Sequence, residues 1–210
     1  MYFPSKFGLK SLEQVIVESF YPDNWHYYEL PETKVEVDDI VVDCGAAEGL
    51  FSLLVFQRCK RVYLIEPHPM FIRSLRKTFE KSNNIELLQY ALSKNEFIAH
   101  LTSDGISSTI SSEITGIEIR VTTLDKLFFE ENIPVSYLKI DLEGRDYDAL
   151  VGAEKLIKQN KPKIAITTYH QIEHARKISS FLKAIDPSYK IYVKGIYQES
   201  GSPIMLHAWI

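Results

Sequence analysis

Five short apolar runs recur along the chain, and most are followed by a segment whose apolar residues repeat at helical spacing. A strand buried on both faces of a parallel sheet reads as a continuous apolar run, without alternation of polar residues. The five runs therefore predict the central strands of a parallel sheet. They lie at residues 40–42, 61–66, 85–90, 135–140 and 164–168.

Helical spacing predicts the elements that connect these strands. Helices are expected at residues 11–20, 48–56, 71–79 and 124–129, and a longer one follows the fourth strand. That longer helix is expected to begin at a cap formed by Asp146. Its apolar face consists of Tyr147, Leu150, Ala153 and Ile157. A last helix is expected to face the core with Ile172, Ala175, Ile178, Leu182 and Ile185.

Two further pairs of segments alternate between polar and apolar residues, as antiparallel strands do. Residues 97–101 and 117–121 are the expected arms of a hairpin, and the Ser- and Thr-rich residues 103–112 are an expected loop. Residues 189–193 and 204–209 are expected to close the chain as an antiparallel pair. The predicted fold is α/β: a doubly wound, mostly parallel seven-stranded sheet with an antiparallel C-terminal hairpin.

The turn after the first strand has the strongest chemical signal. Small residues there let a ligand approach the backbone closely, and free N–H groups at a helix start can face it. The spacing is D-x-G-x-x-x-G, from Asp43 through Gly45 to Gly49, and not the G-x-G-x-x-G of dinucleotide-binding proteins. An acid before the first glycine suits a cationic ligand. We therefore expect S-adenosylmethionine, with Asp43 organising its methionine end.

Further candidates follow the other predicted strands, where ligands of open α/β sheets bind. Glu66 ends the second strand, at the place where nucleotide-binding folds hold ribose hydroxyls with an acid. Ala91 follows the third strand, where adenine would rest. Asp141 and Glu143 follow the fourth strand and His170 follows the fifth, so these three are candidates for the reaction centre.

Composition narrows the class of protein without changing this picture. The 210 residues fit one domain, 45% of them hydrophobic and 25% charged. The net charge is −4, and no run of Lys or Arg indicates a nucleic-acid partner. Two cysteines do not make a disulfide framework. No signal sequence or membrane-spanning run is present, which predicts a cytoplasmic protein without stable membrane insertion; the oligomeric state stays open.

Several motifs taken together resemble a known family. They are VVDCGAAEG, VYLIEPHP, ALS, TTLDKL, LKIDLEGRDYDALVGA and PKIAITTYH, the fifth being the most specific. Together they look like the FkbM-type S-adenosylmethionine-dependent methyltransferases, over residues 35–170. The resemblance implies a class I, Rossmann-like methyltransferase domain at residues 35–210, preceded by a helix and an aromatic lead-in at residues 1–34.

The resemblance also implies an activity and a set of site residues. Members methylate a hydroxyl oxygen of a sugar or another natural product, so a small molecule or a glycan is the expected acceptor. Independently of the resemblance, a loop as long as residues 103–112 is usually functional or disordered, so it is expected either to border the acceptor site or to be a solvated connection. Two features depart from the family pattern: His68 within EPHP, and a short N-terminal region. The implied cofactor contacts are Asp43, Gly45, Ala46 and Gly49 at the methionine end, Glu66 at the ribose and Ala91 at the adenine.

An alcohol is a weak nucleophile, so a general base is expected. With an ordinary pKa near 6.5, His170 is the first candidate, and Asp141 is the alternative, as base or as the group that orients the acceptor. His170 could instead only begin the following helix. Non-catalytic binding of the cofactor or a nucleotide is the alternative function, and a nicotinamide-dependent oxidoreductase is disfavoured by the missing third glycine.

Metal chemistry is not expected. The segment from His170 to His174 matches the H-x-x-E-H pattern of zinc peptidases, but that site needs both histidines on one helix, and His170 directly follows a strand. Magnesium-dependent methyltransferases of the catechol type need an acid–amide pair after the fifth strand, where Thr167 to His170 stand here. Nucleic-acid amino-methyltransferases carry an Asn/Asp-Pro-Pro-aromatic segment after the fourth strand. The segment DLEG, which follows the fourth strand here, does not match that pattern.

Overall fold

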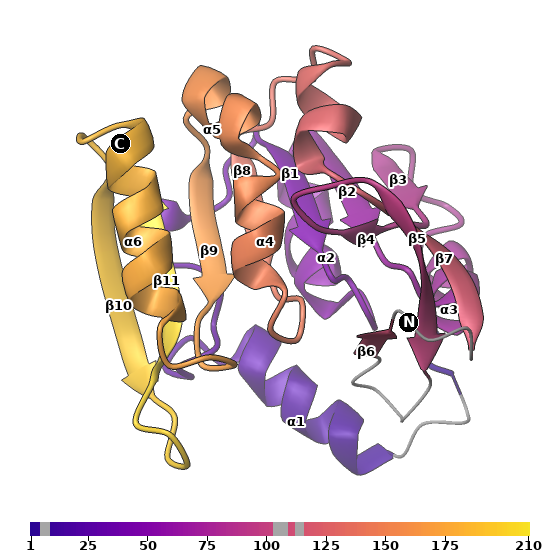
Figure 1. The fold of residues 1–210 in the computed structure, drawn as a ribbon. Coiled ribbons are helices and arrows are strands. Elements are labelled where there is room, and N and C mark those ends of the chain that lie inside the picture. Colours follow the sequence, from indigo (N-terminus) through magenta and orange to yellow (C-terminus); the bar gives the residue numbers. More distant parts are fainter. Residues whose placement is uncertain (5–8, 103–108, 112–115) are drawn as a thin grey trace.

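The computed structural model describes residues 1–4, 9–102, 109–111 and 116–210, and its centre is a seven-stranded sheet (Figure 1). The strand order is β10-β11-β9-β8-β1-β2-β3. The strands are β1 (Ile40–Cys44), β2 (Arg61–Ile65), β3 (Ile85–Leu88), β8 (Tyr137–Ile140), β9 (Lys163–Thr167), β10 (Lys190–Ile196) and β11 (Pro203–Trp209). All five predicted central strands and the terminal pair are present.

The pairing directions confirm the predicted fold class. β1 pairs in parallel with β2 and β8, β2 with β3, and β8 with β9. β11 is antiparallel to both β9 and β10. The chain therefore begins its sheet in the middle at β1, winds outward to β3, and returns to β8 on the other side. Such an order leaves a crevice at the carboxyl ends of β1 and β8, where ligands of this architecture bind.

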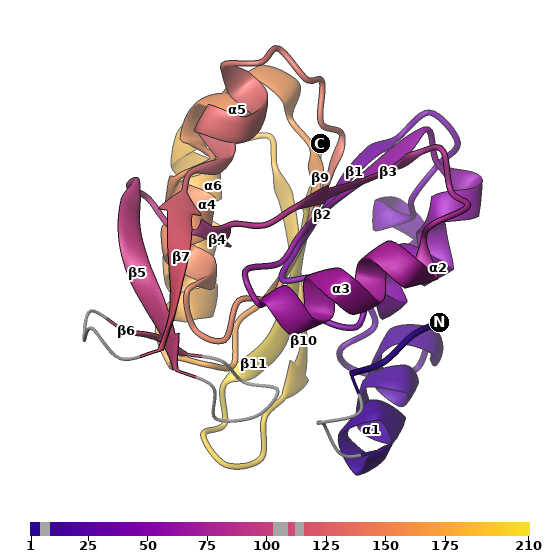
Figure 2. The same cartoon turned by 90° about the vertical axis from the view of Figure 1, so that its right-hand side faces the viewer.

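Helices cover both faces of the sheet (Figure 2). One face packs against α4 (Asp146–Val151), α5 (Glu154–Asn160) and α6 (His174–Ile185). The other packs against α2 (Leu50–Val55) and α3 (Pro69–Thr78). Neighbouring strand residues alternate between the two cores, Val42 in the first and Val41 in the second. Three short 3₁₀ or π segments also occur: Pro31–Thr33, Phe56–Arg58 and Asp125–Phe129.

A second, four-stranded sheet has the order β4-β7-β5-β6. Its strands are β4 (Ala91–Leu92), β5 (Phe97–Thr102), β6 (Thr109–Ser111) and β7 (Ile117–Thr122). β5 and β7 are antiparallel, which confirms the predicted hairpin arms. Of the predicted loop at 103–112, residues 103–108 and 112 lie outside the described residues, and the rest forms β6.

The helix predicted through residues 147–157 is wrong, because α4 and α5 are separate. A Cβ at Gly152 would lie 2.3 Å from the carbonyl oxygen of Ser93, so a glycine is needed where the chain passes between them. Asp125 then caps α5: its carboxylate accepts hydrogen bonds from the amides of Lys155 and Leu156, at 3.1 and 2.8 Å. The periodicity continues across the break, and only these long-range contacts interrupt the helix.

Two other local predictions also need correction. Asp146 makes no capping bond to α4; it binds the preceding loop, where its carboxylate accepts from the amides of Leu142 and Gly144. Ile172 is 73% exposed, because α6 begins only at His174. The structure therefore does not place His170 and His174 together within one helix.

The N-terminal helix α1 (Leu9–Phe20) runs below the carboxyl ends of the central strands in Figure 1. It contacts α2, and four of its residues line the cavity described below. In the described part of the chain, no helix combines the length and the apolar character needed to cross a lipid bilayer.

Candidate active site

A cavity of about 610 Å³ lies at the carboxyl ends of the central strands. Its walls come from the turn after β1, the acid after β2, strand β4, the loop after β8 and the residues after β9. Helix α1 and the segment after it form a further wall. The volume is in the range of small-molecule and cofactor sites, and the position is the one that the strand order favours.

The turn after β1 depends on its two glycines for different reasons. Gly45 has φ +77°, and a Cβ there would lie 2.0 Å from the carbonyl oxygen of Asp141. Gly45 and Ala46 line the cavity, as their predicted role requires. Gly49 does not line the cavity. A Cβ at Gly49, which also has φ +77°, would lie 2.5 Å from the Leu75 side chain, so this glycine permits α2 to pack on α3.

Asp43 is not among the residues that line the cavity, and its predicted contact with the ligand stays a prediction. It is 1% exposed, and its two oxygens are occupied by protein groups: Oδ1 lies 3.0 Å from Nζ of Lys139, and Oδ2 accepts from Ser52. Burial disfavours the charge of Lys139, but Asp43 and Asp141 raise its pKa above the ordinary value. Lys139 also donates to the carbonyl of Gly45 at 2.7 Å, so the ion pair of Asp43 and Lys139 stabilises the glycine turn.

Glu66 lies in the cavity wall as the sequence predicts. Its carboxylate accepts hydrogen bonds from the amides of Ala47 (3.0 Å) and His68 (2.7 Å), which fixes it against the turn. Burial raises the pKa of Glu66 to about 7, against the opposing effect of these two bonds and of Lys139. Ala91, the predicted adenine contact, lines the same cavity. The ribose and adenine roles of these residues stay predictions.

Asp141 is one of the residues that line the cavity. Its Oδ2 accepts from the hydroxyl of Tyr28 at 2.7 Å, and its Oδ1 lies 3.1 Å from that of Thr167. Burial alone would raise its pKa, but the charges of Lys139 and His170 and the bond from Tyr28 lower it below the ordinary value. Asp141 is therefore an oriented carboxylate that stays ionised at neutral pH.

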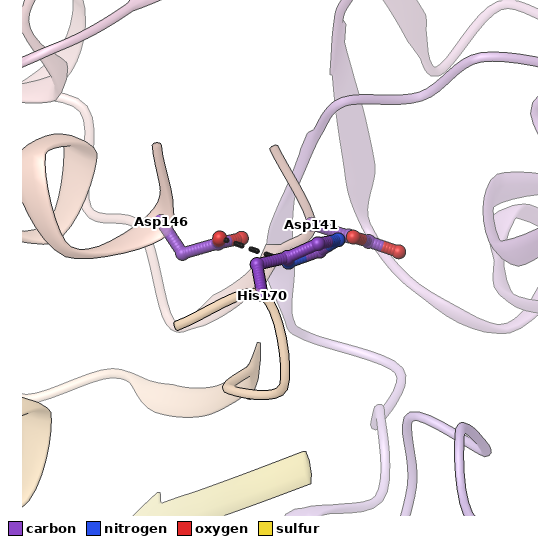
Figure 3. Close-up of side chains that lie close together, drawn as sticks. All are labelled: Asp141, Asp146 and His170. Atoms are coloured by element: carbon purple, nitrogen blue, oxygen red, sulfur yellow. Dashed lines mark ion pairs between the residues drawn. The ribbon is translucent and has the colours of Figure 1, made fainter. Parts of the chain in front are cut away.

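His170 lies between carboxylates, and Figure 3 shows its ring between Asp141 and Asp146. Nδ1 lies 3.3 Å from Asp146, which is fully buried, and Nε2 lies 3.4 Å from Glu143. Burial lowers the pKa of His170, but Asp146 and Glu143 outweigh it and raise the pKa to about 10. The predicted pKa near 6.5 is therefore wrong: His170 is a cation at neutral pH and has no free site for a proton.

This charge state predicts how stability depends on pH. The folded-state pKa of His170 is above its unfolded value, so its stabilising effect is complete below about pH 6.5. That effect is lost as the pH rises through about 10. The free energy of unfolding should thus exceed that of His170→Gln most at low pH, and the difference should shrink toward pH 10. Denaturant titrations of both proteins from pH 6 to 10 measure it.

Nuclear magnetic resonance of the imidazole rings supplies a direct check with an internal control. The ring of His170 should remain protonated at pH 8. His207 is buried next to Lys194, and its pKa is lowered to about 3, first by burial and then by that charge, so its ring should stay neutral throughout. A midpoint near pH 6.5 for His170 would contradict the ion-pair account.

Ligand atoms of Asp141, Asp146 and His170 lie within 4.8 Å of one another, a spacing that a metal ion could bridge. These groups already have partners, however. The carboxylate of Asp146 accepts from the amides of Leu142 and Gly144 and faces the His170 ring, and Oδ2 of Asp141 accepts from Tyr28. The hydroxyl of Thr167 lies 2.9 Å from Oδ1 of Asp146 and 3.1 Å from Oδ1 of Asp141, and its one proton can be donated to either of them. These side chains therefore have partners without a metal, as a protonated histidine paired with carboxylates. The expectation that no metal takes part stays a prediction.

Sequence reasoning missed several residues of this site. Lys139 is 4% exposed within an otherwise apolar strand, and a charge in such a run signals a buried partner, here its cross-strand neighbour Asp43. Tyr28 and His26 come from the aromatic lead-in predicted at residues 1–34, and both line the cavity. Glu18 belongs to α1, where nothing in the helical pattern indicates a cavity.

The comparisons with known proteins agree with this geometry. The model of the methyltransferase FkbM domain family matches residues 43–188. The FkbM methyltransferase from Methylobacillus flagellatus KT is 21% identical with a TM-score of 0.64; the match covers 83% of this chain and 44% of that chain. The present chain therefore spans less than half the length of that relative. No curated protein matches the chain.

Two further solved structures match almost the whole chain. A putative methyltransferase from Streptococcus mutans in complex with SAH has a TM-score of 0.54 and 12% identity, covering 95% of this chain and 96% of that chain. A SAM-dependent methyltransferase from Aquifex aeolicus has a TM-score of 0.52 and 15% identity, covering 100% of both. These likenesses show the fold, and the family model extends over more than two thirds of the sequence. The chain belongs to the FkbM family of S-adenosylmethionine-dependent methyltransferases.

Proposed function

We propose that the protein transfers a methyl group from S-adenosylmethionine to a hydroxyl oxygen of a sugar, a glycan or another natural product. One observation supports this most directly: Asp141, an ionised and oriented carboxylate, lines the same cavity as the glycine turn and Glu66. The proposed cofactor site and a group that can orient an alcohol therefore lie in the same cavity.

The residues present fit the cofactor. The small residues Gly45 and Ala46 leave space at the methionine end, Glu66 offers a carboxylate for ribose hydroxyls, and Ala91 and Leu92 offer an apolar wall for adenine. The bound cofactor supplies an electrophilic methyl group on a sulfonium. The protein must hold the acceptor oxygen in line with that methyl, and such positioning contributes much of the rate.

Asp141 is the group that does so in this proposal. Each of its oxygens lies within hydrogen-bond distance of a protein hydroxyl, and a carboxylate has further lone pairs for an acceptor hydroxyl. Asp141 orients that hydroxyl and takes its proton as the new O–C bond forms and the bond between the methyl group and sulfur breaks, which leaves a neutral thioether. Because the raised pKa of His170 favours its protonated form at neutral pH, we assign the role of base to Asp141 in place of His170. His170 holds Asp141 ionised and fixes Glu143, and it is a positioning residue.

The remaining walls suit a polyhydroxylated acceptor. The rings of Tyr169 and Tyr197 lie 5.0 Å apart between centroids, and His26 packs edge-on against Tyr169 at 5.2 Å. Aromatic faces beside carboxylates are a suitable environment for sugars, whose C–H faces are apolar and whose hydroxyls donate. Glu143 is half-exposed at the same place and can accept from such hydroxyls.

The test is methyl transfer itself. The protein is incubated with S-adenosylmethionine labelled in its methyl group and with a panel of monosaccharides, glycans, glycolipids and phenolic natural products. Alkali-stable label in a glycosidic fraction, mapped to an ether oxygen by mass spectrometry, is the expected result. Label on nitrogen, or cofactor binding without transfer to any member of the panel, would count against it.

Removal of metal ions should leave the reaction intact. The carboxylates nearest the acceptor already have protein partners, so we expect turnover after treatment with EDTA and dialysis to stay within about 2-fold of the untreated rate. The measurement is the initial rate on the acceptor that the panel identifies. Turnover that is lost with EDTA and restored by Mg²⁺ would show that Asp141, Asp146 and His170 bind a metal.

A further inference from the structure

One carboxylate oxygen in the glycine turn has no hydrogen-bond partner among the described residues. Glu48 is 4% exposed, and its Oε1 is buried without a hydrogen bond from any described residue. Burial raises the pKa of Glu48, as do the charges of Asp141 and Glu18, while its own backbone N–H and Lys139 oppose the rise. A buried, unpaired acid is costly, so its presence in a cavity wall indicates a ligand that pairs with it.

The other acids beside the turn do not have such an unpaired carboxylate oxygen. Asp43, Glu66 and Asp141 each have both carboxylate oxygens engaged by protein groups. Their partners are Lys139 and Ser52 for Asp43, the amides of Ala47 and His68 for Glu66, and the hydroxyls of Tyr28 and Thr167 for Asp141. Among these four acids, only Glu48 keeps a buried oxygen that has neither a hydrogen bond nor an ion pair with a described residue.

Among the described residues, no side chain forms a salt bridge with Glu48. Lys139 is already paired with Asp43 and donates to the Gly45 carbonyl, and His170 is paired with Asp146 and Glu143. Arg145 also lines the cavity and is likewise not paired with Glu48. The acids Glu18, Glu66 and Asp141 line the same cavity. The surroundings of Glu48 therefore favour a positively charged group brought by the ligand.

We propose that Glu48 binds the α-ammonium group of the methionine moiety of the cofactor. This inference rests on the proposed function and assigns to Glu48 the contact that the sequence assigned to Asp43. Glu48 is in the same turn as Gly45, Ala46 and Ala47, which line the cavity. An ammonium has three donors and no acceptor, so the free Oε1 is a chemically matched partner, and the pair is formed away from water.

A cycle that combines one protein change with one ligand change tests this contact. The ligands are S-adenosylhomocysteine and its analogue with hydrogen in place of the α-amino group; the proteins are wild type and Glu48→Gln. Wild type should bind S-adenosylhomocysteine at least ~10-fold more tightly than the analogue, because only the former pairs with Glu48. Glu48→Gln should lose at least ~10-fold for S-adenosylhomocysteine and less than about 3-fold for the analogue.

Glu86→Gln is the matched control. Glu86 lies in β3, outside the cavity, and its Oε2 is 3.3 Å from Nη1 of Arg61 at the surface. Its substitution should change the affinity for S-adenosylhomocysteine by less than about 3-fold, because a surface ion pair contributes little. Isothermal calorimetry gives the affinities, and thermal unfolding shows that each variant is folded.

The outcomes separate this inference from the proposed function. Equal affinity of wild type for the two ligands would overturn the Glu48 contact without reference to any variant. So would an unchanged affinity of folded Glu48→Gln for S-adenosylhomocysteine. A wild-type protein that binds neither ligand would overturn the proposed cofactor, and hence the proposed function with it.

Discussion

Asp141→Asn should lower methyl transfer by about 10²- to 10⁴-fold, the range attributed to a positioned acid or base. The amide has the shape of the carboxylate and can still accept from Tyr28 or Thr167, so the fold should persist. It cannot take the proton of the acceptor hydroxyl. Turnover with saturating acceptor is the measurement, and the affinity for S-adenosylhomocysteine should change far less than turnover, since the lost interaction belongs to the transition state.

Asp148→Asn is the control for this prediction. Asp148 belongs to α4, a few residues beyond Asp141, but it lies outside the cavity and pairs with Lys94 at the surface. Surface pairs contribute little, about 0–1 kcal/mol, so this variant should keep wild-type stability and turnover. If Asp141→Asn retains more than half of the wild-type turnover, Asp141 neither orients nor deprotonates the acceptor.

Gly45→Ala should lower the affinity for S-adenosylhomocysteine by more than ~100-fold, because one added carbon damages the turn in two ways. The residue has φ +77°, which costs a non-glycine residue about 1–2 kcal/mol. The new Cβ would also lie 2.0 Å from the carbonyl oxygen of Asp141, and a rigid backbone atom must move to relieve that clash. The turn and the loop after β8 separate as a result, and both the cofactor site and the position of Asp141 change.

Gly201→Ala is the control, because it introduces the backbone strain without the clash. Gly201 has φ +71°, close to that of Gly45, but a Cβ added there would have no neighbouring atom within 4 Å. Both variants should therefore lose the stability that backbone strain accounts for. Only Gly45→Ala should lose binding as well, as calorimetry would measure. Equal binding by the two variants would show that the contact between the turn and the loop after β8 does not matter.

The sequence determined the strands and the turn because those features are local. A strand such as β8, buried on both faces, is mostly apolar, and its residues reveal it without any neighbour. The positions of Glu66, Asp141 and His170 at strand ends followed from the same logic, since carboxyl ends of parallel strands meet at one edge. The break between α4 and α5 did not follow, because it depends on Ser93 and Asp125, distant in sequence.

Only the tertiary structure decided which partners and which charge the site residues have. In the sequence Asp43 has no evident partner. In the fold, parallel pairing of β1 with β8 places Lys139 opposite Asp43, and the two side chains form an ion pair. His170 has an ordinary pKa as an isolated residue, and three distant acids in the folded chain make it a cation. Glu48 is an ordinary helix-forming residue in the sequence and an unpaired buried acid in the fold. Charge state depends on burial and on the neighbours that folding brings within a few ångströms, and a linear pattern contains neither.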